Sequence, residues 1–330
     1  MQPFLLIPVL ISFLIVLTVL PIWIKKCKDI GLLWEDMNKY GHPKNVASSG
    51  GLIVVLGFVL GSLFYIALKT FTDLSGNNNA LEIFSLLSVI LILGIIGLTD
   101  DLLGWKNKGL SVNTRIILSF LAAIPLVVIN AGSHTMNIPI FGTINFGYIY
   151  PLFFIPLGIA GATTTYNFLA GYNGLEAGQG ILILTFLSYV AFATGTPWLS
   201  LIGLCMVASL LGFYIFNKFP AKVFPGDILT YSIGALIAGM AILGDFEKIA
   251  VIAFIPYILE VILKVRGGLK KHSFGIPRKD GTLKMPYKKI YGLEHAAIKV
   301  LGKNATEKKV TYLIHAFQIL FILIALLVMG

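Results

Sequence analysis

The chain has 330 residues, of which 57% are hydrophobic and only 12% are charged, and its formal net charge is +10. A soluble domain averages about a quarter charged residues, so this composition excludes an ordinary soluble domain and predicts an all-α polytopic membrane protein. Two cysteines, Cys27 among lysines and Cys205 in an apolar segment, indicate neither a disulfide framework nor a CxxC metal site.

Stretches of about 20 apolar residues predict about ten transmembrane helices in a single integral membrane domain, residues 1–330. The sixth and seventh are separated only by "TGTP" and should form a tight hairpin, and Pro256 should kink or break the ninth. The predicted spans are 3–24, 47–68, 81–99, 113–130, 148–166, 179–194, 197–216, 228–244, 249–265 and 311–329.

Successive loops between these spans must lie on alternating sides of the membrane. This assignment places 23 of the 25 Lys and Arg residues on one side and leaves Lys69 and Lys248 on the other. This positive-inside signal predicts extracytoplasmic termini and cytoplasmic charged loops, the largest a basic loop at about 266–310. The basic residues either serve only to orient the protein in the membrane, or they also attract anionic lipid headgroups or a phosphorylated substrate. Nucleic acid binding is not expected, because no recognition motif accompanies the lysines.

The first cytoplasmic gap is "WEDMNKYGHPKNVASSGG", and the next ends the third span with "GLTDDLLG". Adjacent carboxylates at Asp100 and Asp101 repel unless a cation lies nearby. The alternative is a solvated helix end, which the helix dipole mildly disfavours for acids. Alone, the pair is a weak indication of a functional site.

The run "YNFLAGYNGLEAGQG" follows the fifth span and contains Asn167, Asn173 and Glu176 among its glycines. Oxygen donors beside accessible backbone N–H groups suit Mg²⁺ and phosphate oxygens. A glycine-rich turn with Asn caps would explain the glycines well and the Asn and Glu content poorly.

Asp227 follows "VFPG" and precedes the eighth span, so it is expected as the N-cap or first-turn residue of that helix. Capping alone would explain it. However, this is the third cytoplasmic gap that offers an oxygen donor. A Mg²⁺ site needs only one or two protein ligands plus water and substrate phosphates, and these gaps together supply them.

The basic loop contains "LKKHSFGIPRKDGTLKMPYKKIYGLEH", a composition that suits a cover over a polyanion. The histidines are scattered without paired ligand spacing, so zinc is not expected. No Walker loop, GxGxxG or Ser-His-Asp arrangement occurs.

The motifs "GLTDDLLG", "YNFLAGYNGLEAGQ" and "VFPGDILTY" resemble those of the polyprenyl-phosphate N-acetylhexosamine-1-phosphate transferases of glycosyltransferase family 4, in the same order and on the expected cytoplasmic gaps. The middle motif, together with "DMNK", looks most like the eukaryotic and archaeal UDP-GlcNAc:dolichyl-phosphate GlcNAc-1-phosphate transferases. The resemblance spans nearly the whole chain. It implies transfer of a sugar-1-phosphate from a UDP-sugar to a polyisoprenyl phosphate, release of UMP, and use of Mg²⁺ with Mn²⁺ as a substitute.

The resemblance also implies roles for particular residues. Asp227 with Asn167 would ligate Mg²⁺, and the catalytic Asp100 and Asp101 would bind or deprotonate the lipid phosphate. The UDP-sugar and its phosphates would be bound by Asp36, Asn38, Lys39, Arg115, Asn173, Glu176, Phe224 and Arg278.

Two departures from the family pattern are Gly104, where a polar residue is common, and Gly275, where eukaryotic members carry a basic residue before "IPR". The second weakens any inference about which N-acetyl sugar is read.

The expected partners are a UDP-N-acetylhexosamine, a polyisoprenyl phosphate and the bilayer of a cell or endoplasmic-reticulum-type membrane, with a homodimer as one option. An undecaprenyl-phosphate acceptor is the alternative within the family, and a covalent route with Asp100 as nucleophile is the alternative mechanism. A lipid or sugar transporter is disfavoured because its acids would lie at the bilayer midplane, where only Glu260 is expected. A lipid acceptor also requires an apolar groove, for which the predicted break near Pro256 is the candidate wall.

Overall fold

The computed structural model describes residues 6–72, 79–138 and 142–329; residues 3–5 of the first predicted span lie outside these ranges. The helices are α1 (Ile7–Ile30), α2 (Gly51–Phe71), α3 (Ala80–Lys106), α4 (Val112–Leu121), α5 (Ile124–Val128), η2 (Tyr150–Phe154), α6 (Ile155–Tyr166), α7 (Leu175–Ala193), α8 (Pro197–Asn217), α9 (Asp227–Leu243), α10 (Glu247–Ala253), α11 (Ile255–Arg266), α12 (Leu293–Leu301), η3 (Gly302–Asn304) and α13 (Glu307–Met329). Three antiparallel strand pairs complete the described chain: β1 (Leu33–Glu35) with β2 (Lys44–Ala47), β3 (Thr135–Ile138) with β4 (Gly142–Asn145), and β5 (Ile276–Pro277) with β6 (Leu283–Lys284).

Each of the ten predicted apolar segments is helical, and the protein is a helical membrane protein. Six helices of the described chain are long and apolar enough to cross a bilayer, namely α1, α2, α3, α7, α8 and α13. The other four segments contain shorter helices. Three of these segments are divided, and Pro125, Pro151, Pro156 and Pro256 lie in the first turns of the pieces, where a missing N–H costs nothing.

Two local predictions are confirmed. The hairpin between α7 and α8 turns in three residues after Ala193, and the break expected near Pro256 separates α10 from α11 at Phe254. The loop at about 266–310 is partly ordered, because it contains β5, β6 and the amphipathic helix α12.

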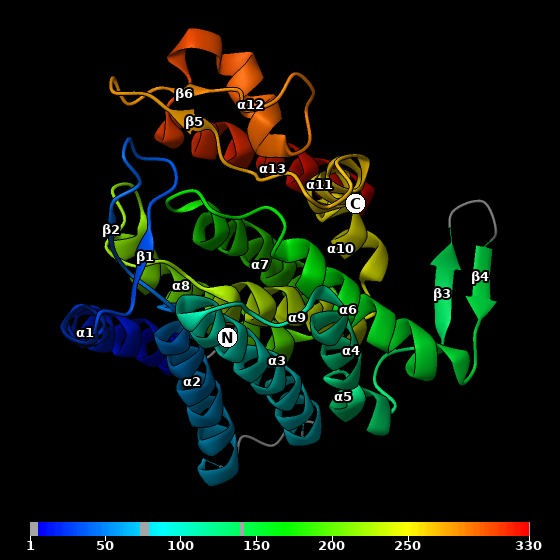
Figure 1. Ribbon diagram of the computed structural model, residues 1–330. Coiled ribbons are helices and arrows are strands. Elements are labelled where there is room, and N and C mark those ends of the chain that lie inside the picture. The colour runs from blue at the N-terminus through cyan, green and yellow to red at the C-terminus, as the bar shows by residue number, and fades with distance from the viewer. Residues whose placement is uncertain (1–5, 73–78, 139–141, 330) are drawn as a thin grey trace.

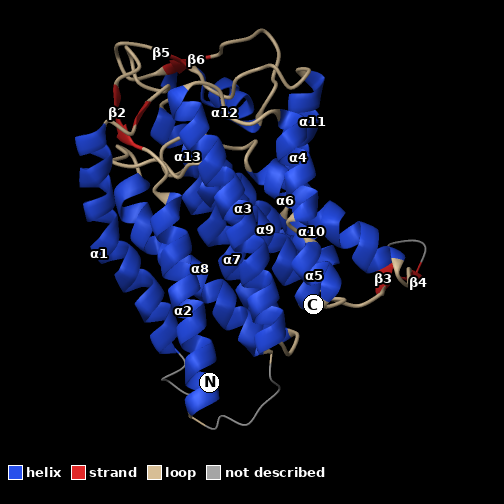
Figure 2. Cartoon of the chain, turned by 60° about the horizontal axis from the view of Figure 1, so that its bottom comes forward, coloured by secondary structure: helices blue, strands red, loops and turns tan. Residues whose placement is uncertain are grey.

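Helix α9 lies in the middle of the bundle and is buried along almost its whole length. Figure 1 shows α3, α6, α7 and α8 around it, and α2, α3, α6 and α7 all pack on it. Figure 2 shows β2, β5, β6 and α12 gathered at one end of the bundle and both chain ends away from it. The α9 N-terminus therefore opens toward the loop-bearing end, where the polar motifs lie.

Candidate active site

The start of α9 is held by a carboxylate from α3. Asp101 accepts hydrogen bonds from the backbone N–H groups of Asp227 (2.8 Å) and Ile228 (3.5 Å), and from Ser49 Oγ at 3.1 Å. The first N–H groups of a helix have no acceptor inside that helix. Asp101 of α3 therefore acts as the N-cap acceptor of α9, although it belongs to another helix. Asp227 is the first-turn residue, as expected, but it is not the capping group.

Two glycines allow this close approach. Gly226 precedes α9 with φ +73°, a conformation that side chains rarely adopt, and a Cβ there would also strike the Asp101 carboxylate. Gly97 of α3 faces the Asp227 backbone, where a Cβ would come within 2.6 Å of the Asp227 carbonyl carbon. The "PGD" sequence and Gly97 are therefore needed to bring α3 and α9 together.

Arg115, on α4, joins two of the predicted acids. Its Nη1 lies 3.1 Å from Asp100 Oδ2 and 3.4 Å from Asp227 Oδ2. The other oxygen of Asp100 accepts a hydrogen bond from Leu110 N–H. Acids that are far apart in the sequence thus share one guanidinium, which offsets their mutual repulsion.

Asn167 caps the end of α6 and points toward the first turn of α9. Its Oδ1 accepts a hydrogen bond from Thr230 Oγ1 at 3.0 Å, and Thr230 lies three residues after Asp227. The Asn167 carboxamide and the Asp227 carboxylate therefore lie beside the same helical turn.

Asp101, Asn167, Asp227 and Thr230 line a cavity of about 460 Å³, here termed the carboxylate pocket, and the Asp100–Arg115 pair lies outside its lining. Segments from five parts of the chain meet there, as the sequence analysis expected for Asp101, Asn167, Glu176, Phe224 and Asp227. The lining is Trp34, Glu35, Met37, Ser48, Asp101, Asn167, Ala170, Gly171, Tyr172, Glu176, Phe224, Pro225, Gly226, Asp227, Thr230, His272 and Phe274.

Glu176 is buried and serves the glycine-rich loop. Its Oε1 accepts a hydrogen bond from Gly171 N–H at 2.7 Å, and its backbone carbonyl accepts one from Tyr166 Oη at 2.6 Å. One carboxyl group thereby fixes the loop between α6 and α7 against the pocket.

Four predicted substrate-binding residues form instead a cluster that ties three loops together, here termed the loop lock. Lys39 pairs with Asp36 at 3.3 Å and with Glu307. Glu307 accepts a hydrogen bond from Asn173 N–H at 2.8 Å, and Asn173 Nδ2 lies 3.4 Å from Asp36 Oδ2. Asn38 Nδ2 donates to Gly171 O at 2.8 Å. None of the four lines the carboxylate pocket, so their observed contacts position the pocket walls.

The sequence analysis missed Glu307, the first residue of α13. An acid at the start of a span and a glycine-rich motif more than 100 residues away share no local pattern. The available sign was an acidic first turn after a basic loop.

Two residues of the basic loop, the departure Gly275 and the predicted substrate-binding residue Arg278, lie outside the carboxylate pocket. Gly275 N–H donates to Tyr172 Oη at 3.2 Å, and a Cβ there would come within 2.9 Å of Ile298 Cδ1, so a larger side chain would have to displace Ile298. Arg278 is exposed in the β5–β6 turn, where its N–H donates to Thr282 O, and it lines none of the pockets described here.

The donors around α9 fit a hard cation. Among the described residues, no group of three or more His, Cys, Asp or Glu side chains forms a complete metal cage. Mg²⁺ does not require one, because it keeps several waters and takes one or two carboxylates with substrate phosphates. The Asp227 carboxylate, the Asn167 carboxamide oxygen and the nearby Asp100 carboxylate supply that donor set.

An apolar cavity of about 450 Å³, the apolar pocket, runs between α6, α9 and the α10–α11 break. Its walls include Phe154, Leu157, Ile237, Val251, Phe254, Ile258 and Val261. The predicted apolar wall near Pro256 therefore lies where the structure has an apolar cavity.

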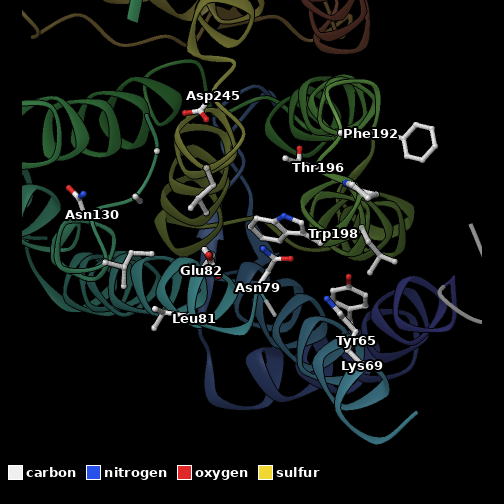
Figure 3. Close-up of a pocket in the computed structure, with 17 residues that line it drawn as sticks. Tyr65, Lys69, Asn79, Leu81, Glu82, Asn130, Phe192, Thr196, Trp198 and Asp245 are labelled. Atoms are coloured by element: carbon white, nitrogen blue, oxygen red, sulfur yellow. The ribbon is translucent and has the colours of Figure 1, made fainter. Parts of the chain in front are cut away.

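A cavity of about 880 Å³, larger than the two described above, lies at the opposite end of the bundle and is termed the distal pocket. Figure 3 shows Trp198, Tyr65, Glu82 and Asp245 among the side chains around it. None of the predicted site residues lines it.

Comparison with known proteins agrees with this geometry. Residues 83–245, which include the α3 acids and the start of α9, match the model of glycosyl transferase family 4. A relative in Saccharolobus solfataricus, provisionally named UDP-N-acetylglucosamine–dolichyl-phosphate N-acetylglucosaminephosphotransferase, is 34% identical over 98% of this chain and 96% of its own. A Sulfolobus acidocaldarius relative with the same provisional name is 32% identical over 97% and 94%.

A bacterial relative matches over a shorter range. The phospho-N-acetylmuramoyl-pentapeptide-transferase of Streptococcus agalactiae is 32% identical over 70% of each chain. The archaeal matches cover nearly the full length, so the resemblance lies on the archaeal side, and the chain belongs to glycosyl transferase family 4.

Proposed function

We propose that this protein transfers N-acetylglucosamine-1-phosphate from UDP-N-acetylglucosamine to a dolichyl-type polyisoprenyl phosphate and releases UMP. The names of the two archaeal relatives support both substrates. The observation that carries the proposal is the convergence of Asp100, Asp227 and Asn167 around one turn of α9. Two carboxylates, a carboxamide and a guanidinium suit a diphosphate substrate, whose reaction chiefly needs positioning and charge neutralisation.

The proposed cofactor is Mg²⁺, with Mn²⁺ as a substitute, held by Asp227 and Asn167 with Asp100 beside them. When bound, the cation would neutralise charge on the phosphate oxygens. Arg115 already spans two of these acids, so it lies where phosphate oxygens would meet both a cation and a guanidinium. Phe224 offers an aromatic surface for the uracil ring from the pocket wall.

The proposed reaction is a direct displacement. An oxygen of the lipid phosphate forms a bond to the β-phosphorus of the UDP-sugar, the bond from that phosphorus to the bridging oxygen breaks, and UMP leaves. The alternative covalent route needs a free carboxylate, but one Asp100 oxygen accepts from Leu110 N–H and the other pairs with Arg115. Asp101 is occupied as the cap of α9. Direct attack is therefore the simpler route.

The proposed topology has about ten membrane crossings, with extracytoplasmic termini and the carboxylate pocket facing the cytoplasm. The 23-to-2 division of basic residues supports this orientation. The prenyl chain would lie in the apolar pocket, which has residues of α10 and α11 in its wall.

The test is an assay of purified protein with labelled UDP-N-acetylglucosamine and either dolichyl phosphate or undecaprenyl phosphate. UMP and a lipid-linked sugar phosphate are expected with Mg²⁺ and not with EDTA, and dolichyl phosphate should be the better acceptor. Release of UDP in place of UMP would show ordinary glycosyl transfer and overturn the proposed reaction.

A further inference from the structure

A cavity of about 310 Å³, the basic pocket, adjoins the carboxylate pocket and shares Asn167, Ala170, His272 and Phe274 with it. Its other walls carry the basic side chains Arg115, Lys264 and Lys271. No Asp or Glu is found among its described lining residues. A cavity with several cations and no acid in its wall favours an anion.

The basic pocket lies beside the apolar pocket along α6 and α11, although the two share none of their described lining residues. On α6, Thr164 lines the basic pocket and its neighbour Thr165 lines the apolar pocket. On α11, Val261 of the apolar pocket precedes Lys264 of the basic pocket by three residues, so both lie on one helix face. A prenyl chain in the apolar pocket would thus end with its headgroup near Lys264.

Lys264 is the buried cation of this wall, at 8% exposure. Its Nζ donates to Ser273 Oγ and pairs with Glu260 Oε1 at 3.4 Å. An ammonium group has three N–H donors, so these two contacts leave one for a ligand. Glu260 is held in turn by Leu293 N–H, which donates to its other oxygen at 2.6 Å. The start of α12 therefore orients the lysine through Glu260.

A second buried acid, Glu294, lies against the same group. A Cβ on Gly292 would meet Glu294 Oε2 at 2.6 Å and Glu260 Oε1 at 2.9 Å, so the two carboxyl groups approach the same point beside that glycine. Burial and the neighbouring charge of Glu260 raise the pKa of Glu294 well above its usual range. This shift favours the neutral form of Glu294, whereas Glu260 forms the ion pair with Lys264.

We infer that Lys264 anchors the phosphate group of the polyisoprenyl phosphate in the basic pocket, and that Glu260 is the positioning residue that holds it. The inference rests on the proposed function and assigns the lipid phosphate, rather than the diphosphate of the UDP-sugar, to this cavity. The position of the apolar pocket one turn earlier on α11 favours the lipid as the source of the phosphate.

The first experiment measures binding without turnover. Full-length protein in detergent is titrated with farnesyl phosphate in the absence of UDP-sugar, and with farnesol as the probe that lacks phosphate. Wild-type protein is expected to prefer farnesyl phosphate, and Lys264→Gln should reduce that preference about tenfold or more. Lys303→Gln removes an exposed charge from η3 and should leave the preference intact. An unchanged preference in Lys264→Gln would overturn the inference.

The second experiment separates the two substrates during turnover. Lys264→Gln should raise the KM for polyisoprenyl phosphate about tenfold to a hundredfold while the KM for UDP-N-acetylglucosamine stays within about twofold. Lys264→Arg, which keeps the charge, should recover part of the loss and guards against a folding defect. A rise in the UDP-sugar KM alone would assign Lys264 to the nucleotide and refute the inference.

The two acids beside Lys264 are compared with each other. Glu294→Gln mimics a neutral acid and should keep the farnesyl phosphate preference. The double variant Glu260→Gln/Glu294→Gln leaves Lys264 buried without a counter-charge, which favours its neutral form, and should lose the preference. Loss in Glu294→Gln alone, at an unchanged melting temperature, would contradict the neutral assignment.

The two proposals fail separately. Binding of farnesyl phosphate through Lys264 with no sugar-phosphate transfer would refute the proposed function and leave the anchor in place. Transfer with a lipid KM that does not depend on Lys264 would refute the anchor and leave the function.

Discussion

Helix α9 has the carboxylate pocket at its first residue and the distal pocket near its last, and the two pockets hold their acidic residues in different ways. At its first residue, Asp227 lines the carboxylate pocket of about 460 Å³, and two residues after its end, Asp245 lines the distal pocket of about 880 Å³. Asp227 shares a guanidinium with Asp100 and lies near a carboxamide. Asp245 accepts a hydrogen bond from Ser133 N–H at 2.7 Å, as an acid that fastens a loop would. The proposed function therefore assigns the chemistry to the smaller pocket, because Asp100, Arg115 and Asp227 converge beside it.

The largest expected effect is on turnover, and it distinguishes the two ends of α9. Asp227→Ala should lower turnover roughly 10³-fold, because it removes a carboxylate directed at the diphosphate. Asp245→Ala, at the other end of the same helix, should leave turnover within about twofold. UMP release with dolichyl phosphate measures both, and near-normal Mg²⁺-dependent turnover in Asp227→Ala would end the assignment.

A second change tests whether Asp101 is a cap or a reactant. Asp101→Ala leaves the first N–H groups of α9 without their acceptor, and should cost about 1 kcal/mol of stability and about tenfold in turnover. Asp101→Asn keeps an acceptor oxygen and should retain the melting temperature. Comparison of thermal unfolding in detergent with turnover decides the matter: a stable but inactive Asp101→Asn would show that its charge takes part in the reaction.

The loop lock should couple residues that are far apart in sequence. Lys39→Met and Glu307→Gln should each lower the melting temperature, and the double variant should cost less than the sum, with a coupling of about 1 kcal/mol. Lys44→Met, an exposed lysine on β2, is the control. Strict additivity of the Lys39 and Glu307 effects would show that the lock contributes nothing to stability.

The smallest expected effects are changes in the pH dependence of stability at the loop-bearing end. Burial and nearby Lys264 lower the pKa of His295 from 6.5 to about 4. The folded state therefore binds fewer protons, and stability should fall as pH drops from 6.5 toward 4. His295→Gln should flatten this fall in the melting temperature.

Glu294 should change the pH dependence of stability in the opposite direction to His295. Because burial raises the pKa of Glu294 above its usual value, the folded state holds a proton that the unfolded chain releases, and stability should fall as pH rises above about 4.3. Glu294→Gln should flatten this side of the profile. Parallel profiles for wild type and both variants would show that neither group titrates differently on folding.

The amino-acid sequence by itself determined the helical segments, the Pro256 break and the polar ends of the helices. Each of these depends on local composition: apolar runs of span length, prolines in first turns, and acids or carboxamides where a run stops. The juxtaposition of Asp100, Asn167 and Asp227 was also predictable, because the motifs occupy alternate gaps and so the same end of the bundle.

Only the tertiary structure decided what each polar group does there. Asp100 and Asp101 are neighbours in sequence, but successive helical residues point in different directions, so one pairs with Arg115 and the other caps α9. The loop lock joins Glu307 to residues more than 100 positions away, and Glu260 of α11 accepts a hydrogen bond from Leu293 N–H at the start of α12. These two partnerships have no local pattern, because packing of separate elements selects them, whereas the Glu260–Lys264 pair is an i,i+4 pair within α11.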